Sequence, residues 1–352
     1  MKDIKIKPDA TLREAMQAMD DTAENALLVV RADDVFVGTV TDGDIRRAIL
    51  GGLDLAGTIE TVFATAPTFF YEDEFDLAAI RSTLTEKKID LVPILSRDNR
   101  VVDFVTWESA FGDARAKGED IGAPVVIMAG GRGTRLEPFT KVLPKPLIPV
   151  GDQPIVNHVI DEFLRFGTSQ FYMIVNYKAR ILKAYFEELQ PSYALSFVEE
   201  TLQLGTAGGL KLLAGTITET FFLSNCDTVI YADYSDIYRQ HHEDGNALTL
   251  VASVAHHHMP YGVCQLTTGG DLESLVEKPE YSFLVNSGLY LMNPELIDRI
   301  PEGKFYHMTD LIADLLRDGE KVGVYPISEK SWLDVGEWSQ YREVVQALER
   351  GT

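Results

Sequence analysis

Hydrophobic and polar positions repeat one pattern twice within the first 110 residues. Apolar residues at helical spacing lead to a short apolar run, a polar turn and a second apolar run, and the same succession returns 65 residues later. The predicted strands are 26–30, 35–40, 91–95 and 101–105. A tandem repeat of this length predicts two similar units that pack together.

The pattern changes after residue 124 to an alternation of strands and helices. The segment 125–129 is a continuous apolar run, as expected for a strand that is buried on both faces of a sheet. Further strands are predicted at 171–175, 195–198, 221–223, 247–255 and 284–292, with helices at 155–166 and 179–189. This alternation predicts a mainly parallel sheet covered by helices, with ligands at the carboxyl ends of the strands.

A polar segment at 114–124 separates the two patterns. It contains few large apolar residues and ends in Gly122-Ala123-Pro124 before the next strand, as domain linkers often do. We therefore predict a first domain over residues 1–118 and a second domain over residues 123–352.

Composition narrows the possible partners and locations. The 352 residues carry a net charge of −22, which would repel a nucleic acid backbone. No apolar run reaches the roughly 18 residues of a membrane span, and the amino-terminal residues lack a signal-peptide core. Cys226 and Cys264 are the two cysteines of the sequence, so no disulfide framework is expected. We expect a cytoplasmic protein that binds neither nucleic acid nor membrane.

The strongest chemical signal is the segment 125–150, VVIMAGGRGTRLEPFTKVLPKPLIPV. A buried strand enters a glycine-rich turn, where backbone N–H groups can approach an anion, and a proline-rich stretch follows in place of a helix. This order excludes the dinucleotide motif GxGxxG, and the lysine of a P-loop is missing. The segment resembles, with no departure in spacing, the G-G-x-G-T-R-L-x-P-x-T-x-x-x-P-K-P signature of the nucleoside-diphosphate-sugar pyrophosphorylase family.

Nucleotidyl transfer depends on charge neutralisation and alignment, because two anions must meet at the α-phosphorus of a nucleoside triphosphate. A guanidinium such as that of Arg135 suits the β- and γ-phosphates, and Lys145, fixed between two prolines, suits the α-phosphate. The resemblance implies the same catalytic roles for both residues. It also implies a nucleotide-binding loop made of Gly130, Gly131, Gly133 and Thr134.

Two carboxylates are predicted to complete the site. Asp227 ends the segment FFLSNCD, whose apolar part is the strand 221–223, and Asp334 stands in SWLDVG, which resembles the family's W-x-D-x-G. Mg²⁺ is often held by one or two carboxylates and the substrate's phosphates. We therefore predict a Mg²⁺ cofactor on Asp227 and Asp334, with Asp227 also catalytic. The sequence NCD at 225–227 departs mildly from the family's N-G-D.

Four further elements match the same family, and the resemblance assigns them to the substrates. The elements are LGTAG at 204–208, YGV at 261–263, EKP at 277–279 and NSG at 286–288. The residues implied in sugar-phosphate binding are Gly262, Glu277, Lys278 and Asn286. The residues implied in nucleotide binding are Gly205, Thr206 and Gly208. The loop LGTAG is also consistent with a helix start that has Thr206 near the cap.

The amino-terminal repeat resembles tandem CBS modules, also called a Bateman module. The segment 38–44, GTVTDGD, matches their G-x-x-T-x-x-D, which implies that Thr41 and Asp44 contact the phosphate and the ribose of a regulatory purine nucleotide. In the second copy Ser109 replaces the carboxylate, so we predict one nucleotide per chain. A module for dimerisation alone is the alternative. We expect a homodimer or a higher homo-oligomer.

Two other clusters are interpreted as structural. The three histidines at 256–258 lie on a predicted strand, where neighbouring side chains alternate between faces and cannot all ligate one metal ion. The aromatic residues Trp332, Trp338 and Tyr341 are predicted to pack rather than to stack on a base.

Together the resemblances imply an α/β fold, in which a Rossmann-like nucleotidyltransferase domain with a mixed, mainly parallel sheet is preceded by a CBS-pair α+β domain. The motifs are most similar to the guanylyltransferases that make GDP-amino sugars in legionaminic acid biosynthesis, which implies GTP and glucosamine 1-phosphate as substrates. Mannose- or heptose-1-phosphate guanylyltransferases and thymidylyl- or uridylyltransferases share the same core and stay open. A nucleotide-sensing regulator without activity is also open, although the predicted catalytic and metal-binding residues are all present.

Overall fold

The computed structural model describes residues 3–22, 24–50, 52–87, 89–110, 119–327, 331–338 and 341. The chain forms two compact units. The first contains Met1–Ala110 and His256–Phe283, and the second contains Phe111–Ala255 and Leu284–Thr352. The predicted boundary at residues 118–123 lies close to the division after Ala110. The segment His256–Phe283 was predicted to be part of the second domain, but it belongs to the first unit.

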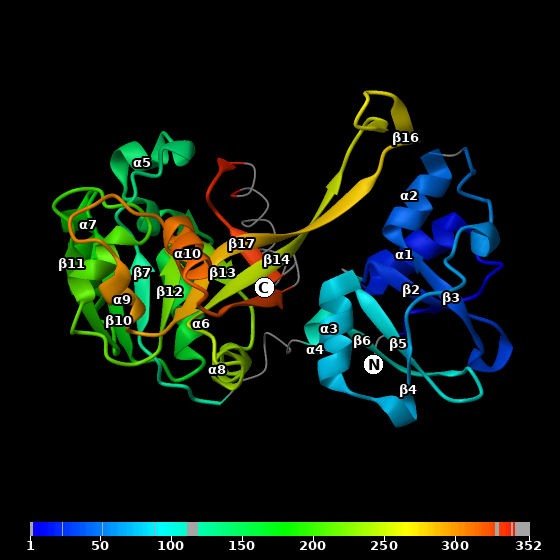
Figure 1. Cartoon of the computed structure of the whole chain (residues 1–352), viewed down its shortest axis with the longest axis horizontal. Helices are drawn as coiled ribbons and strands as arrows, with labels where there is room; N and C mark the ends of the chain where they lie inside the picture. The colour runs from blue at the N-terminus through cyan, green and yellow to red at the C-terminus, as the bar shows by residue number, and fades with distance from the viewer. Residues whose placement is uncertain are drawn as a thin grey trace. The chain divides into compact units, whose positions relative to one another are not determined.

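The first unit contains two copies of one arrangement of strands and helices (Figure 1). The first copy consists of β1 (Lys5–Ile6), α1 (Leu12–Thr22), β2 (Ala26–Val30), β3 (Phe36–Thr41) and α2 (Asp42–Leu50). The second consists of β4 (Phe70–Tyr71), α3 (Leu77–Lys87), β5 (Leu91–Leu95), β6 (Val101–Thr106) and α4 (Trp107–Ala110). In each copy the middle strand of a three-stranded sheet pairs in parallel with the first strand and antiparallel with the third. The predicted repeat is confirmed.

The two copies also agree in the register of their strand pairing. The pairing of the middle and third strands shifts between Val29 and Val30 in the first sheet, and between Ile94 and Leu95 in the second. β2 and β5 are buried along their whole length, which explains their uninterrupted apolar sequences. Side chains of both copies, among them Leu28 and Leu95, join one hydrophobic core.

The first unit also includes an antiparallel hairpin of β15 (Val263–Leu266) and β16 (Leu272–Val276). This hairpin lies in the chain between β14 (Leu248–His258) and β17 (Glu280–Met292). β14 contains the three histidines on a strand, as predicted, and their side chains lie outside the described part of the structure.

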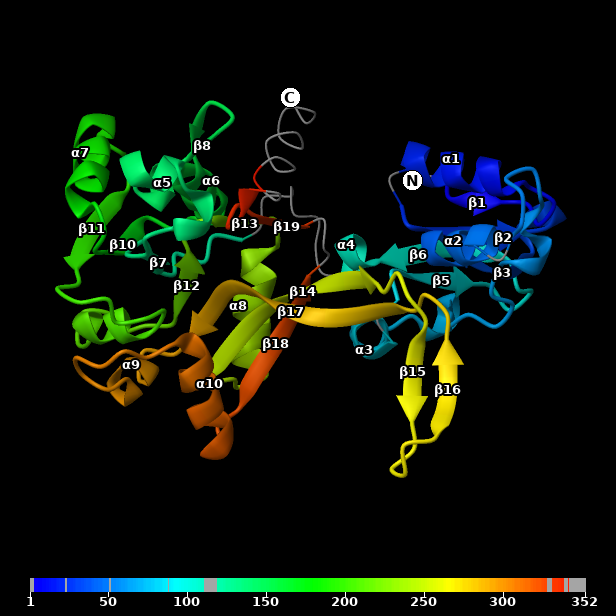
Figure 2. The ribbon, with the colours of Figure 1, turned by 90° about the horizontal axis from the view of Figure 1, so that it is seen from above.

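A seven-stranded sheet forms the centre of the second unit (Figure 2). Besides β14 and β17, its strands are β7 (Val125–Met128), β10 (Gln170–Val175), β11 (Ala194–Glu199), β12 (Phe221–Asn225) and β18 (Val322–Ile327). The strand order is β11-β10-β7-β12-β17-β14-β18. Strands β11, β10, β7 and β12 run parallel to one another, and β14 runs parallel to β18, whereas β17 is antiparallel to β12. The predicted mixed and mainly parallel sheet is confirmed.

Helices cover both faces of this sheet. On one face, α6 (Ile155–Leu164) and α8 (Tyr234–Glu243) meet the sheet in an aromatic cluster, where the ring of Phe163 lies 5.5 Å from that of Phe222 and 4.6 Å from that of Tyr234. On the other face, α9 (Leu296–Arg299), α10 (Met308–Arg317) and the 3₁₀ helix Gly208–Leu213 share a core with Val126 and Leu223. Because side chains of a strand alternate between faces, both layers are packed from the same strands.

The described part of the second unit also contains further helices and four short strands outside the central sheet. The helices are α5 (Phe139–Val142), α7 (Ala179–Leu189) and the 3₁₀ turns Thr134–Leu136 and Lys145–Leu147. The strands are β8 (Pro149–Val150), β9 (Gln153–Pro154), β13 (Thr228–Ile230) and β19 (Trp332–Asp334). The antiparallel pair of β13 and β19 connects the segment after β12 with a segment about a hundred residues further along the chain.

Candidate active site

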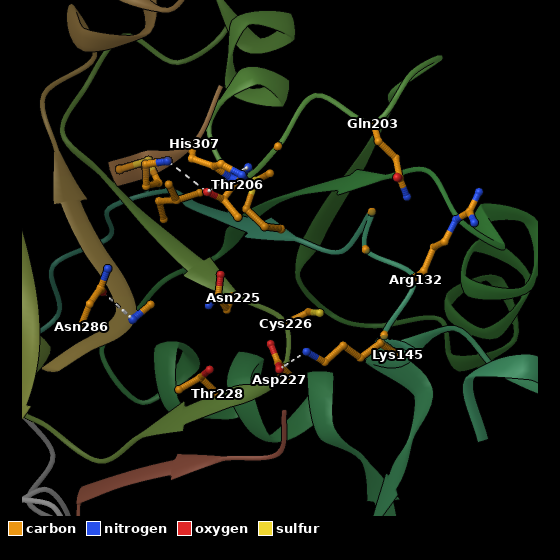
Figure 3. A pocket seen from close by; sticks show the side chains of 18 of the residues that line it. Arg132, Lys145, Gln203, Thr206, Asn225, Cys226, Asp227, Thr228, Asn286 and His307 are labelled. Atoms are coloured by element: carbon orange, nitrogen blue, oxygen red, sulfur yellow. Dashed lines mark hydrogen bonds and ion pairs between the residues drawn. The ribbon is translucent and has the colours of Figure 1, made fainter. Parts of the chain in front are cut away.

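A cavity of about 820 Å³ lies in the second unit, beside the carboxyl ends of β7 and β12. Its wall is formed by the glycine-rich loop after β7, the residues that follow β12, parts of β17 and β19, the loop 203–206, and the start of α10 together with Phe305 and His307 before it. Figure 3 shows Arg132 and Lys145 on one side of this cavity, with Thr206 and His307 across from them. This is the position in which open α/β sheets bind ligands.

The glycine-rich loop is shaped by close contacts that a side chain would block. Gly133 has a φ of 64°, and a Cβ placed on it would lie 2.8 Å from Cγ2 of Thr140 and 3.1 Å from Cβ of Lys145. The hydroxyl of Thr140 donates to the carbonyl of Gly133 at 2.9 Å, which ties the loop to the segment after it. Gly131 has nothing within 4 Å of the same position, so its backbone faces open space. All four predicted loop residues, Gly130, Gly131, Gly133 and Thr134, line the cavity.

Lys145 and Asp227 form a largely buried ion pair on the cavity wall (Figure 3). Nζ of Lys145 contacts Oδ2 of Asp227, and the two side chains are 14% and 10% exposed. Pro144 and Pro146 flank the lysine in a 3₁₀ turn and restrict its backbone. Burial lowers the pKa of Lys145, but the charges of Asp227 and Asp334 outweigh burial and hold the pKa above its ordinary value. Lys145 is therefore positively charged at neutral pH.

The pairing of β13 with β19 brings Asp334 beside Asp227, because Thr228 lies opposite Asp334. The backbone N–H of Val335 also donates to the carbonyl of Asp227 at 3.0 Å. Burial and the charge of Asp227 raise the pKa of Asp334, against a hydrogen bond from the N–H of Gly336. Two adjacent carboxylates that repel each other suit a divalent cation. Within the described ranges no three His, Cys, Asp or Glu residues gather around a possible metal position, so substrate oxygens would have to complete it.

The segment 125–150, here termed the signature segment because it resembles the family signature, contains two arginines, Arg132 and Arg135. Both are exposed on the cavity wall. Nη1 of Arg135 lies 2.8 Å from Oε1 of Glu337. Arg132 has no ion pair or hydrogen bond with any residue that the structure describes. The cavity thus has two predicted cations, Arg135 and Lys145, and a third in Arg132, for which the sequence analysis proposed no role.

The loop 204–208 is fixed against the segment that precedes α10. Gly205 has a φ of 84°, and a Cβ on it would lie 2.5 Å from the carbonyl oxygen of Tyr306. That oxygen accepts from the N–H groups of Ala207 and Gly208, both at 3.0 Å. The hydroxyl of Thr206 accepts from the N–H of Met308, the first residue of α10, at 3.0 Å. Thr206 therefore accepts a hydrogen bond from a backbone N–H at the start of α10. It was predicted to lie near the cap of a helix that follows it in sequence.

The predicted nucleotide-binding residues of this loop divide into two groups. Gly205 and Thr206 line the cavity. Gly208 does not, because its backbone packs beneath the loop, where a Cβ would lie 2.8 Å from the carbonyl oxygen of Lys304.

The predicted sugar-phosphate residues are also divided. Asn286 lines the cavity, accepts from the N–H of Gly288 at 2.9 Å and donates to the hydroxyl of Tyr290 at 2.6 Å. Gly262, Glu277 and Lys278 belong to the first unit and do not line the cavity. A Cβ on Gly262 would lie 2.9 Å from Oε2 of Glu277, so these two are neighbours in the hairpin. The roles of these residues stay predictions.

Glu200 is a cavity residue that the sequence analysis missed. It follows β11 directly, and its carboxylate lies between two glycines, 2.9 Å from a Cβ placed on Gly130 and in overlap with one placed on Gly209. Its Oε1 is buried and has no hydrogen-bond partner among the residues that the structure describes. Burial raises the pKa of Glu200 to about 7. The available signal was the acidic pair Glu199-Glu200 at the end of a predicted strand, the same kind of position as Asp227.

Thr41 and Asp44 form a capping box at the start of α2. Oδ2 of Asp44 accepts from the N–H of Thr41 at 2.9 Å and from its hydroxyl at 2.7 Å, and the hydroxyl oxygen of Thr41 accepts from the N–H of Asp44 at 3.2 Å. Thr106 and Ser109 repeat this arrangement at α4, with distances of 2.8 and 3.2 Å. The two residues therefore have a structural role, and nucleotide binding by them stays a prediction.

The three aromatic residues near the chain's end do not all behave alike. Trp338 and Tyr341 pack on Phe139, with ring centres 4.9 and 6.0 Å away, as predicted. Trp332 instead lines the cavity, and within the described ranges its buried Nε1 has no hydrogen-bond partner. The interpretation of Trp332 as packing alone is therefore incomplete.

Comparison with known sequences matches both parts of the chain to protein families. Residues 124–351 match the family described as Nucleotidyl transferase, and residues 1–51 match the CBS domain. Mannose-1-phosphate guanyltransferase of Saccharomyces cerevisiae is 31% identical over 222 residues, and mannose-1-phosphate guanyltransferase beta-A of Xenopus laevis is 30% identical over 221 residues. Each match covers 60% of this chain and 61% of the relative, so the similarity spans about three fifths of the relatives' length.

Solved structures share the fold of the second unit. HddC from Yersinia pseudotuberculosis, in a complex with GMP-PN, is 22% identical with a TM-score of 0.51, over 64% of this chain and 99% of that chain. A putative glucose-1-phosphate thymidylyltransferase from Bacillus anthracis is 20% identical with a TM-score of 0.52, over 65% of this chain and 96% of that chain. At these identities the likeness concerns the fold alone. Within the described ranges, no helix combines the length and the apolar character that crossing a membrane requires.

Proposed function

The chain belongs to the nucleotidyl transferase family and carries a CBS domain, and on this premise we propose that it transfers GMP from GTP to a sugar 1-phosphate. The products are a GDP-sugar and pyrophosphate. The reaction type is supported by the family and by a cavity that gathers a glycine-rich loop, three cations and two adjacent carboxylates. The choice of guanine rests on one observation, the buried carboxylate of Glu200 in the cavity wall, whose Oε1 has no hydrogen-bond partner in the described part of the chain.

A carboxylate acts only as an acceptor, so its best partner is a base edge with two adjacent donors. Guanine presents such an edge in its N1–H and its exocyclic amino group. Uracil and thymine present one N–H between two carbonyls, whose lone pairs would face the carboxylate. Adenine and cytosine present one amino group beside an unprotonated ring nitrogen. In a buried position, hydrogen-bonding groups that find no partner cost binding free energy, and each of these other bases would leave such groups beside the carboxylate. Glu200 therefore favours guanine.

The geometry supports transfer by holding charge in place. An oxygen of the sugar phosphate attacks the α-phosphorus, the bond from that phosphorus to the bridging oxygen breaks, and pyrophosphate leaves with the bonding electron pair. Lys145 supplies a fixed positive charge for the α-phosphate, because Asp227 holds its ammonium group. Arg135 and the N–H groups of the glycine-rich loop suit the β- and γ-phosphates. Mg²⁺ on Asp227, Asp334 and the phosphates would neutralise the leaving pyrophosphate.

For the acceptor we propose a hexose 1-phosphate, which Asn286 binds at the cavity. The combination of motifs supports glucosamine 1-phosphate. The names of the yeast and Xenopus relatives support mannose 1-phosphate as the second candidate.

For the CBS domain we propose that it binds one regulatory purine nucleotide through Thr41 and Asp44. Because both residues form a capping box, the nucleotide has to compete with Thr41 for the carboxylate of Asp44. Titration calorimetry of the full chain with AMP and ATP tests this, with Ser109→Ala as the control for Asp44→Ala. If neither nucleotide binds at millimolar concentration, the repeat is a dimerisation module.

Pyrophosphate release from a grid of nucleoside triphosphates and sugar 1-phosphates tests the enzymatic proposal. We expect GTP to exceed ATP, UTP, CTP and dTTP with glucosamine or mannose 1-phosphate. Equal rates with UTP or dTTP would overturn the choice of guanine. No pyrophosphate from any pair would overturn the reaction itself and favour a regulator without activity.

A further inference from the structure

The signature arginine Arg135 has an ion-pair partner 202 residues further along the chain. Nη1 of Arg135 lies 2.8 Å from Oε1 of Glu337. Arg135 lines the cavity, whereas Glu337 is not part of the lining. The carboxylate therefore holds the guanidinium from outside the space that a triphosphate would occupy.

Contacts on both sides of Glu337 fix its position. Before it, the N–H of Val335 donates to the carbonyl of Asp227, which ties this segment to the predicted metal carboxylates. After it, the indole N–H of Trp338 donates to the carbonyl of Glu137 at 2.8 Å. This hydrogen bond connects the residues around Glu337 to the signature segment 125–150. The residues on either side of Glu337 are thus hydrogen-bonded to the segments that contain Asp227 and Glu137.

Gly336 allows Arg135 to approach this segment closely. A Cβ on Gly336 would lie 3.5 Å from Nη2 of Arg135, 3.5 Å from Oδ2 of Asp227 and 2.8 Å from Oδ1 of Asp334. The guanidinium therefore lies against the backbone between the two aspartates and Glu337. A larger residue at this position would push one of these groups away.

We propose that Glu337 is a positioning residue that holds Arg135 before a triphosphate binds and competes with the triphosphate for its guanidinium group. The inference rests on the proposed function, in which Arg135 binds the β- and γ-phosphates. A guanidinium offers its paired N–H donors to one planar anion at a time, so phosphate oxygens must replace Glu337 or share Arg135 with it. Both side chains are more than a third exposed, at 65% and 49%, so the exchange is small in energy.

A double-mutant cycle measures this competition. Titration calorimetry with GTP and Mg²⁺, without sugar phosphate, gives the dissociation constant of four proteins: the wild type, E337Q, R135A and the double variant. We expect E337Q to bind GTP about two- to fivefold more tightly at low salt, as an exposed ion pair allows, and to have no effect in the R135A background. E337D keeps the charge and is expected to restore the wild-type dissociation constant.

Matched controls separate this competition from other effects. Glu137 is also on the signature segment but pairs with Lys141 at 3.1 Å, so E137Q removes a nearby charge without freeing Arg135. If E337Q still lowers the dissociation constant of GTP in the R135A background, or if E137Q lowers it equally, the cause is a long-range charge effect and the inference is overturned. Weaker or unchanged binding by E337Q overturns it as well. Absence of any GTP binding by the wild type overturns the proposed function together with the inference.

Discussion

Lys145 and Asp227 are 14% and 10% exposed, whereas Arg135 and Glu337 are 65% and 49% exposed, although both ion pairs contribute to the same cavity. Breaking a buried pair leaves a desolvated charge and typically costs about 3–5 kcal/mol. An exposed pair contributes about 0–1 kcal/mol. The buried pair therefore fixes the geometry around the α-phosphate, whereas the exposed pair is free to exchange partners.

The same contrast divides the other charged residues of the cavity. Glu200 is buried and Asp334 is half-buried, and both belong with the buried pair because burial raises the pKa of each carboxyl. Arg132 belongs with the exposed pair. We expect substitutions of the buried set to change turnover or base choice strongly, and substitutions of the exposed set to change nucleotide affinity weakly.

The largest effect is expected from Lys145→Ala. It removes the positive charge that stabilises the α-phosphorus in the transition state and leaves Asp227 and Asp334 uncompensated, so kcat should fall about 10²-fold or more. Steady-state kinetics with circular dichroism as a folding check measures this. Lys141→Ala is the matched control, because Lys141 is on the same loop and pairs with the exposed Glu137. Near wild-type turnover in folded Lys145→Ala would contradict the catalytic role.

Asp334→Asn should remove most of the activity and weaken the dependence on Mg²⁺. The substitution leaves one carboxylate, Asp227, so an excess of Mg²⁺ should restore the rate only in part. Rates measured against Mg²⁺ concentration, and after EDTA treatment, test this. Asp152→Asn, in the exposed turn between β8 and β9, is the control. Activity that resists EDTA would contradict the assignment of both carboxylates.

Glu200→Gln should change base selection more than turnover. The amide of Gln has a carbonyl oxygen that accepts from the N–H of uracil or thymine and an NH₂ group that donates to a carbonyl of the same base, so we expect the preference for GTP over UTP to fall about 10- to 100-fold. Competition assays with both nucleotides measure this ratio. An unchanged ratio would exclude Glu200 from base recognition and leave the choice of guanine without support.

Glu200 also predicts a pH dependence. Its pKa of about 7 in the folded protein lies above the ordinary 4.5, so the folded chain binds more protons than the unfolded chain between these values. Stability without ligand should therefore fall as pH rises from about 4.5 to about 7 relative to Glu200→Gln, and GTP binding should strengthen as the carboxylate ionises. Thermal unfolding and calorimetry of both proteins across this range test the two directions.

The fold was largely predictable because its signals are local. The uninterrupted apolar sequences of β2 and β5 and the offset of 65 residues between them appear directly in the sequence. The motif around Gly133 was equally readable, since a glycine there avoids contact with Thr140 and Lys145, which belong to the same continuous segment of sequence. The T-x-x-D of Thr41 and Asp44 also has a local meaning as a capping box, which the sequence analysis passed over in favour of a ligand role.

The missed features depend on contacts between distant parts of the chain. Glu200 becomes a cavity residue because β11, β10 and β7 are neighbours in the sheet, an order that no local pattern specifies. Glu337 meets Arg135 across 202 residues. Gly208 fits the motif but packs beneath its loop against Lys304, because a motif gives residue types and not the side on which each residue faces.

The smallest effect is expected from Arg132→Gln. Arg132 lines the cavity, is exposed and has no partner in the described part of the chain, so its loss leaves no carboxylate unpaired and little change in stability is expected. Its charge still attracts a triphosphate, so KM for GTP should rise about threefold at low ionic strength, with kcat unchanged. The difference should disappear near 0.5 M salt, where the Debye length is only about 4 Å. Arg180→Gln, on the exposed side of α7 and outside the cavity lining, is the control. A large loss of kcat would instead place Arg132 with Lys145 among the residues that touch the reacting phosphate.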